Sequence, residues 1–301
     1  MRKKQFLGVL GLLLTGLTLG AAAIDWSKAE PVQRGVLLYR MAIESPRLMK
    51  VNLMRIDLRT PGLRFTGTGR DPDWGKPMPD YPKAKIRTRR IRTADFMRVA
   101  RAAKEEGGSE RNMIVAANSA PWWPWTAPWN HVYAHPSGLG ILNGEVICDS
   151  RPHRAVFVVY EDGRVDIVPE VPESDYGKIR VAASGFAIIL QDGKVLEGGD
   201  YEKKLMPRIA YGLSADRRYL YIVTVDGRQK KWSLGSTGVE TAGFLVDAGA
   251  ADGIDMDGGG SATLCYWDEA EQRPVVVNQQ PKKVERKVGS NIGIYLEPSE
   301  R

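Results

Sequence analysis

The chain has 301 residues, of which 43% are hydrophobic and 26% charged, and its formal net charge is +7. This composition excludes a disordered chain and predicts a globular protein of one large or two small domains. The 32 glycines and 18 prolines favour many strands joined by short turns. We therefore expect an α+β fold with a mixed, mainly antiparallel sheet and a few helices.

Residues 1–23 have the three-part layout of a secretory signal peptide. Residues 2–4 are basic, residues 6–20 are apolar, and residues 21–23 are alanines that suit cleavage. The apolar run is nearly long enough for an uncleaved membrane anchor, but polar residues follow the alanines at once. We expect an exported protein, periplasmic or extracellular, that keeps no membrane span after cleavage.

The mature chain is expected to divide near residue 110. Residues 24–109 would form an N-terminal extension that packs on a main domain of residues 110–297. In the extension, residues 35–43 and 48–58 have the composition and alternation of strands. A helix is predicted to begin at Thr93, a typical N-cap residue.

Positive charge is concentrated just before that helix, at Arg87, Arg89, Arg90 and Arg92. Such a cluster suits a nucleic acid, an anionic polymer or a membrane surface, or it is simply a solvated face. Because an exported protein seldom meets nucleic acid, we expect no nucleic-acid partner and favour anionic glycans or lipids.

Residues 119–137 contain four prolines, show no regular period and are predicted to form a structured loop. Long irregular loops in compact domains are often functional. The tryptophans of this loop are Trp122, Trp123, Trp125 and Trp129. Together they could form a wall for the face of a sugar ring, and Trp123 is the expected sugar contact. The alternative is packing on the core, which we expect for at least half of them. His131 and His135 are four residues apart, but the prolines argue against a helix, so we expect no metal site there.

The second half of the chain reads as strands, tight turns and one helix. Asn143-Gly144 predicts a hairpin, and Thr237 with Glu240 has the spacing of a capping box for a helix at residues 238–248. A strand at residues 253–256 follows, and closing strands are expected at residues 263–266, 275–277 and 292–296.

The strand at residues 253–256 leads into Asp257, three consecutive glycines and two hydroxyl residues. Glycine runs cost backbone entropy, and one reason for them is close approach of a ligand to backbone N–H groups. The residues that could bind a phosphate or an oxyanion here are Gly258, Gly259, Gly260, Ser261 and Thr263. The alternative is a tight turn, but an acid, three glycines and two hydroxyls together favour a site.

Several motifs in this order resemble the phosphodiester glycosidase family over about residues 110–297. The matching segments are Asn118, Pro136-Ser137-Gly138, Asn143-Gly144, Ser184-Gly185, Asp192-Gly193-Lys194, Pro207-Arg208, Asp226-Gly227-Arg228, residues 257–263, Asn278, Glu285-Arg286 and residues 289–293. The resemblance implies an exported hydrolase that cleaves a sugar-phosphodiester linkage in an envelope polymer or exopolysaccharide.

This chemistry needs a cation for the departing phosphate and a carboxylate on the sugar side. Arg208 is the expected cation, and Asp257 is the first choice for the carboxylate. Asp226 is the second choice, although Asp-Gly-Arg is also an ordinary turn. Asn118 and Asn278 could hydrogen-bond sugar hydroxyls.

Other interpretations stay open at this level. Cys148 and Cys265 pair, or both are buried free thiols. No cofactor is expected, but three closely spaced aspartates, Asp252, Asp255 and Asp257, leave a calcium site as a minor alternative. A metal-dependent phosphodiesterase is disfavoured because the chain has only 3 histidines. A non-catalytic carbohydrate-binding protein is the remaining alternative.

Overall fold

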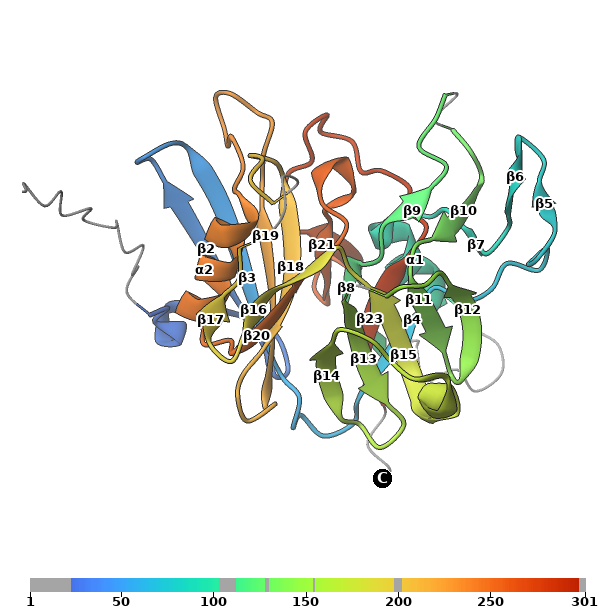
Figure 1. Cartoon of the computed structure of the whole chain (residues 1–301). Coiled ribbons are helices and arrows are strands. Elements are labelled where there is room, and N and C mark those ends of the chain that lie inside the picture. The colour runs from blue at the N-terminus through green and yellow to red at the C-terminus, as the bar shows by residue number, and fades with distance from the viewer. Residues whose placement is uncertain (1–22, 103–111, 128–129, 154, 198–201, 298–301) are drawn as a thin grey trace, which may run out of the picture.

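The computed structural model describes residues 23–102, 112–127, 130–153, 155–197 and 202–297. The predicted α+β class is confirmed: all strand pairs of the described residues are antiparallel, and only two α-helices accompany them (Figure 1). The predicted signal peptide lies outside the described residues, except for its last position. No helix of the described part is long and apolar enough to cross a bilayer.

The largest sheet has eight strands. In spatial order they are β1 (Glu30–Gln33), β2 (Val36–Ile43), β3 (Met49–Asp57), β19 (Tyr219–Val225), β18 (Arg208–Leu213), β20 (Asp252–Asp255), β16 (Ala187–Gln191) and β17 (Lys194–Val195). Helix α2 (Gly238–Ala248) packs on one face of this sheet (Figure 1). The predicted capping box between Thr237 and Glu240 is present, and Gly249 ends the helix in the left-handed conformation.

Two five-stranded sheets face the other side of the large sheet. One contains, in spatial order, β22 (Arg273–Val276), β21 (Leu264–Asp268), β8 (Met113–Asn118), β23 (Asn291–Leu296) and β4 (Leu63–Gly67). The other contains β12 (Glu145–Asp149), β11 (Leu139–Leu142), β15 (Ile179–Ser184), β13 (Val156–Tyr160) and β14 (Val165–Val168). Helix α1 (Thr93–Ala102) covers the outer face of the first of them.

The main core lies where these three sheets meet. Ile56, Ile114 and Phe157 each come from a different sheet and belong to one buried cluster. Strands from both sides of residue 110 share the sheets, since β3 pairs with β19 and β4 pairs with β23.

Two small sheets complete the architecture and carry the tryptophan-rich loop. They are formed by β7 (Thr88–Arg89), β10 (Tyr133–Pro136) and β9 (Trp122–Trp123), and by β5 (Pro77–Met78) and β6 (Tyr81–Lys85). The pairing of β9 with β10 therefore holds the tryptophan-rich loop above the end of β8 (Figure 1).

Candidate active site

The glycine run lies at the point where the large sheet meets β8. After β20 the Asp257 N–H donates to Ser119 O at 2.9 Å, and the Gly259 N–H donates to Pro207 O at 2.8 Å. A Cβ on Gly258 would lie 2.7 Å from Pro207 O, and Gly259 has a φ of +65°. Both positions therefore require glycine, because one has no space for a side chain and the other has left-handed backbone.

Two asparagines hold this turn in place, Asn118 at the end of β8 and Asn278 just after β22. The Asn118 amide donates to Asp257 O at 2.7 Å and accepts from the Thr263 N–H at 2.8 Å, so one side chain joins both ends of the turn. Asn278 accepts from the Leu264 N–H at 3.0 Å and donates to Ala262 O at 2.8 Å. The sugar contacts expected of Asn118 and Asn278 stay untested, and the structure uses both amides to brace the turn.

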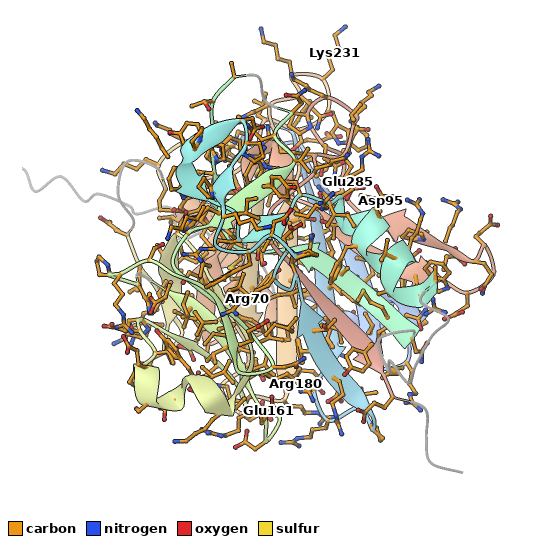
Figure 2. All side chains as sticks on the ribbon, turned by 90° about the vertical axis from the view of Figure 1, so that its right-hand side faces the viewer. Arg70, Asp95, Glu161, Arg180, Lys231 and Glu285 are labelled. Atoms are coloured by element: carbon orange, nitrogen blue, oxygen red, sulfur yellow. The ribbon has the colours of Figure 1, made fainter. Side chains whose placement is uncertain are left out.

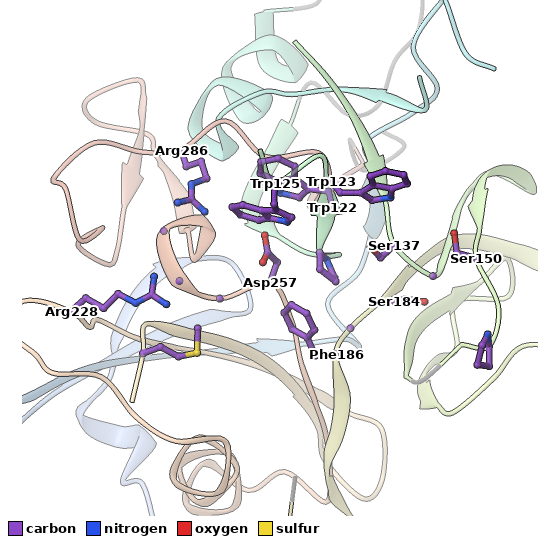
Figure 3. Close-up of a pocket in the computed structure, with 18 residues that line it drawn as sticks. Trp122, Trp123, Trp125, Ser137, Ser150, Ser184, Phe186, Arg228, Asp257 and Arg286 are labelled. Carbon is purple, nitrogen blue, oxygen red and sulfur yellow. The ribbon is translucent and has the colours of Figure 1, made fainter. Parts of the chain in front are cut away.

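A cavity of about 630 Å³ opens above the turn (Figure 3). Its lining combines the glycine run, the tryptophan-rich loop and three serines from the facing sheet region. The residues are Pro121, Trp122, Trp123, Trp125, Ser137, Gly138, Ser150, Pro152, Ser184, Gly185, Phe186, Met206, Arg228, Asp257, Gly258, Gly259, Gly260 and Arg286. Asp257, the three glycines and Trp123 thus line one cavity, whereas Ser261 and Thr263 are buried beneath the turn.

Asp257 is the carboxylate in the cavity wall. Burial raises its pKa to about 7, while the Ser261 hydroxyl, the Arg286 charge and the Trp122 indole limit the rise. Asp257 Oδ2 and Trp122 Nε1 are buried and lack a hydrogen-bond partner among the described residues. A carboxyl with this pKa can hold or release a proton near neutral pH.

Two arginines flank the glycine run. A Cβ on Gly260 would lie 2.7 Å from Arg286 Nη2, and one on Gly259 would lie 3.4 Å from Arg228 Nη1. Arg286 Nη1 also donates to Ser261 Oγ at 3.3 Å. Within the described part of the chain, no carboxylate lies within 4.0 Å of either guanidinium to form an ion pair.

The Arg286 guanidinium carries an electrostatic cost in the free protein. Burial lowers its pKa, Asp257 partly opposes this effect, and the charge of Arg228 lowers the pKa further. An anion placed between the two arginines would relieve their repulsion, and guanidinium groups match phosphate oxygens in geometry.

The opposite side of the cavity is neutral. Figure 3 shows Asp257 between the two arginines on one side and Ser137, Ser150 and Ser184 on the other. Trp122 and Trp125 stack with ring centroids 4.6 Å apart, and this pair lies beside Arg286, whose guanidinium is 4.9 Å from the Trp125 ring centroid. Hydroxyls and aromatic faces of this kind suit an uncharged sugar ring. Trp129 lies outside the described residues.

Arg208, the expected phosphate ligand, lies away from this cavity. Its side chain is fully buried in β18, where Nη1 forms ion pairs with Asp255 at 2.9 Å and Glu202 at 3.1 Å. Its Nη2 donates to Lys204 O at 3.2 Å. These contacts make Arg208 a partner for two buried acids and leave Arg228 and Arg286 as the cations of the cavity.

Asp226, the second expected carboxylate, is also outside the cavity. It is 2% exposed, accepts from Trp232 Nε1 at 2.5 Å and accepts from the Gln279 N–H at 3.0 Å. The side chain thus ties two loops together. The Asp-Gly-Arg segment instead contributes Arg228 to the cavity. Arg228 has a φ of +59°, and the preceding Gly227 packs against Pro207.

The three closely spaced aspartates were the alternative calcium ligands. Asp252 pairs with Arg217 at 2.5 Å and Asp255 with Arg208, so the three aspartates do not converge on one point. No group of three His, Cys, Asp or Glu side chains among the described residues is placed to hold a metal ion.

The histidines and cysteines have separate surroundings. His131 bonds Asp80 at 2.6 Å, and His135 packs against Trp123 with ring centroids 5.3 Å apart. Cys148 and Cys265 are buried free thiols, which decides the alternative that the sequence left open.

Arg228 and Arg286 are the charged residues of the cavity for which the sequence predicted no role. Both belong to segments that carry the family resemblance, Asp226-Gly227-Arg228 and Glu285-Arg286. Their place in these segments was the signal in the sequence that could have identified both arginines as site residues. The residues next to each arginine in the sequence do not indicate which of them reaches the glycine run.

Comparisons with known proteins identify the family of the chain. The phosphodiester glycosidase family matches residues 106–295, and the chain therefore belongs to this family of hydrolases acting on glycosyl phosphodiesters. No curated protein matches the sequence.

Three solved structures share the fold. The catalytic domain of zebrafish N-acetylglucosamine-1-phosphodiester alpha-N-acetylglucosaminidase, auto-inhibited by its pro-peptide, has a TM-score of 0.59 at 17% identity over 93% of this chain and 87% of that one. A hypothetical protein from Synechocystis has a TM-score of 0.59 at 11% identity over 90% of this chain, which spans 65% of that protein's chain. A Burkholderia pseudomallei protein named as exported has a TM-score of 0.55 at 11% identity over 83% of this chain and 74% of that one.

Proposed function

We propose that the protein is an exported hydrolase that cleaves the bond between a sugar's anomeric carbon and a phosphodiester oxygen, in an envelope polymer or exopolysaccharide. The observation that carries the proposal is one cavity holding a buried carboxyl, Asp257, beside two guanidinium groups that form no ion pair with a carboxylate of the described residues. The signal-like layout of residues 1–23 supports export.

The proposed substrate lies across the cavity in one direction. The sugar occupies the side of Ser137, Ser150 and Ser184, and the phosphate lies against Arg228 and Arg286 (Figure 3). The anomeric carbon then lies near Asp257. A phosphodiester oxygen is a weak base, so its departure needs charge neutralisation more than protonation.

Hydrolysis follows from these positions. The anomeric C–O bond breaks, and its electron pair leaves with the phosphate monoester, whose charge the two arginines neutralise. Ionised Asp257 stabilises the oxocarbenium-like sugar or takes a proton from the water that adds to the anomeric carbon. The products are a free sugar and a phosphate monoester.

The test is release of free sugar from synthetic N-acetylglucosamine-1-phosphodiesters by the purified chain, with and without EDTA. We expect EDTA-resistant turnover that Asp257→Asn abolishes. Asp247→Asn is the matched control, because burial raises the pKa of this α2 carboxyl to about 6 and the residue does not line the cavity. Full activity in Asp257→Asn would overturn the proposed role.

Two other outcomes point to the alternatives. Turnover that EDTA removes would support the metal-dependent reading. Binding of the sugar phosphodiesters without turnover by the folded wild type would support a carbohydrate-binding protein, for which the partly exposed Trp125 offers a contact (41% exposed).

A further inference from the structure

A second cavity of about 760 Å³ adjoins the first. The two share five lining residues, Trp122, Trp125, Arg228, Gly260 and Arg286. Figure 3 shows Arg228 and Arg286 opposite the serines. Gly260 and Trp125 lie next to Arg286, and Trp122 stacks on Trp125. The second cavity therefore begins where the proposed phosphate lies, and whatever is attached to the far side of that phosphate enters it.

The lining of this second cavity is strongly basic. It contains six cationic residues and one acidic residue, namely Arg90, Arg92, Arg228, Lys282, Arg286 and Lys287 against Glu285. Glu285 accepts from the Ala94 N–H at 3.0 Å at the start of α1, where burial raises its pKa, and Figure 2 shows it beside Asp95. Among the described lining residues, Glu285 is the one carboxylate, and its side chain is engaged at the start of α1.

Two of the six cations have structural partners. Arg90 donates to Tyr133 O at 2.8 Å and to Pro124 O at 3.1 Å, and Arg92 lies 3.5 Å from Asp95. The other four, Arg228, Lys282, Arg286 and Lys287, have no ion pair with any described carboxylate. Four such cations around one cavity favour a ligand with more than one negative charge.

Apolar surface lies among these charges. Trp125 is 41% exposed and Val284 is 62% exposed, and Pro124 and Pro281 line the same cavity. The Arg286 guanidinium lies over the Trp125 ring, 4.9 Å from its centroid. Exposed aromatic and aliphatic surface beside cations matches a ligand in which sugar rings alternate with anionic groups.

We infer that the second cavity binds the leaving group, and that this group is a glycan carrying at least one further phosphate. The substrate class is then a polymer whose sugars are joined by phosphodiesters, cleaved one linkage at a time, with the next phosphate held by Lys282 and Lys287. This inference rests on the proposed function, because the direction of the substrate comes from the position of Asp257. It also gives a role to part of the arginine cluster at residues 87–92.

The experiment compares two synthetic substrates of equal length. One carries two phosphodiesters, and in the other the phosphate farther from the scissile bond is masked as a neutral methyl triester. The wild type should cleave the doubly charged substrate with about tenfold higher kcat/KM at low ionic strength, and salt should reduce this advantage.

The variant Lys282→Ala/Lys287→Ala should lose that advantage and leave cleavage of the masked substrate unchanged. Lys83→Ala/Lys194→Ala is the matched control, because it removes two exposed lysines outside both cavities. A wild type that cleaves both substrates equally, or a lysine variant that keeps the preference, overturns the inference and leaves the proposed function standing.

If no phosphodiester is cleaved, the proposed function fails, and binding decides the second cavity separately. Quenching of tryptophan fluorescence during titration with the two substrates should then show tighter binding of the doubly charged one, weakened in Lys282→Ala/Lys287→Ala. Equal affinity for both substrates would also overturn the inference.

Discussion

Replacing Asp257 by asparagine should make the protein more stable at alkaline pH. Burial raises the pKa of this carboxyl from its ordinary value of 3.8 to about 7. The unfolded chain therefore releases this proton at a lower pH than the native protein does. Between these two pKa values the unfolded state binds fewer protons than the native state, so the wild type loses stability as pH rises through that window.

The full difference in pKa corresponds to up to about 4 kcal/mol at pH 8, at 1.36 kcal/mol for each pH unit. Asparagine has a similar shape and cannot ionise, so the variant escapes this loss. We expect thermal unfolding to show similar stability of Asp257→Asn and the wild type at about pH 3.5, below the ordinary pKa of the carboxyl. At pH 8 the variant should unfold up to roughly 8 °C higher, at about 2 °C for each kcal/mol.

The control for this prediction is Asp247→Asn, and the pH dependence of kcat/KM tests the same Asp257 carboxyl. Asp247→Asn should show a smaller shift of the same sign, because this carboxyl is only partly buried. In the wild type, kcat/KM should rise as pH increases through about 7, since the proposed mechanism needs ionised Asp257. A wild type that becomes more stable relative to Asp257→Asn as pH rises would refute the reasoning, because its native state would then favour the carboxylate.

Three further variants test the neighbouring groups. Arg208→Met should lower the free energy of unfolding in denaturant titration by about 3–5 kcal/mol, because two buried carboxylates lose their cation; a fully stable but inactive variant would contradict this. Gly260→Ala should displace the Arg286 guanidinium and lower kcat/KM about tenfold or more at nearly unchanged stability, whereas Gly177→Ala, with open space around it, should leave the kinetics unchanged; equal kinetics for both would argue against the phosphate role. Asn278→Ala should cost about 1–3 kcal/mol by thermal unfolding because two backbone groups lose their partner, and an unchanged melting temperature would show that another group holds the turn.

Local pattern was sufficient to predict the elements around the site. The capping residues Thr237 and Glu240 predicted the start of α2, and apolar patterning predicted β2, β3 and β20 of the large sheet. The acid followed by three glycines marked the turn, because its backbone demands are local and leave a direct trace in residue type. The sequence alone therefore determined the α+β class, the turn and Asp257 as its carboxylate.

Only the tertiary structure decided which polar side chains meet at that turn. Arg208 lies in β18 beside β20, and the register of that pair directs its guanidinium to Asp255, inside the protein. Arg228 and Arg286 come from separate loops and converge on the glycines. Asn118 reaches the turn across 139 residues of chain. Such contacts depend on strand pairing and packing between distant segments, and neither is encoded in the pattern near any one of these residues.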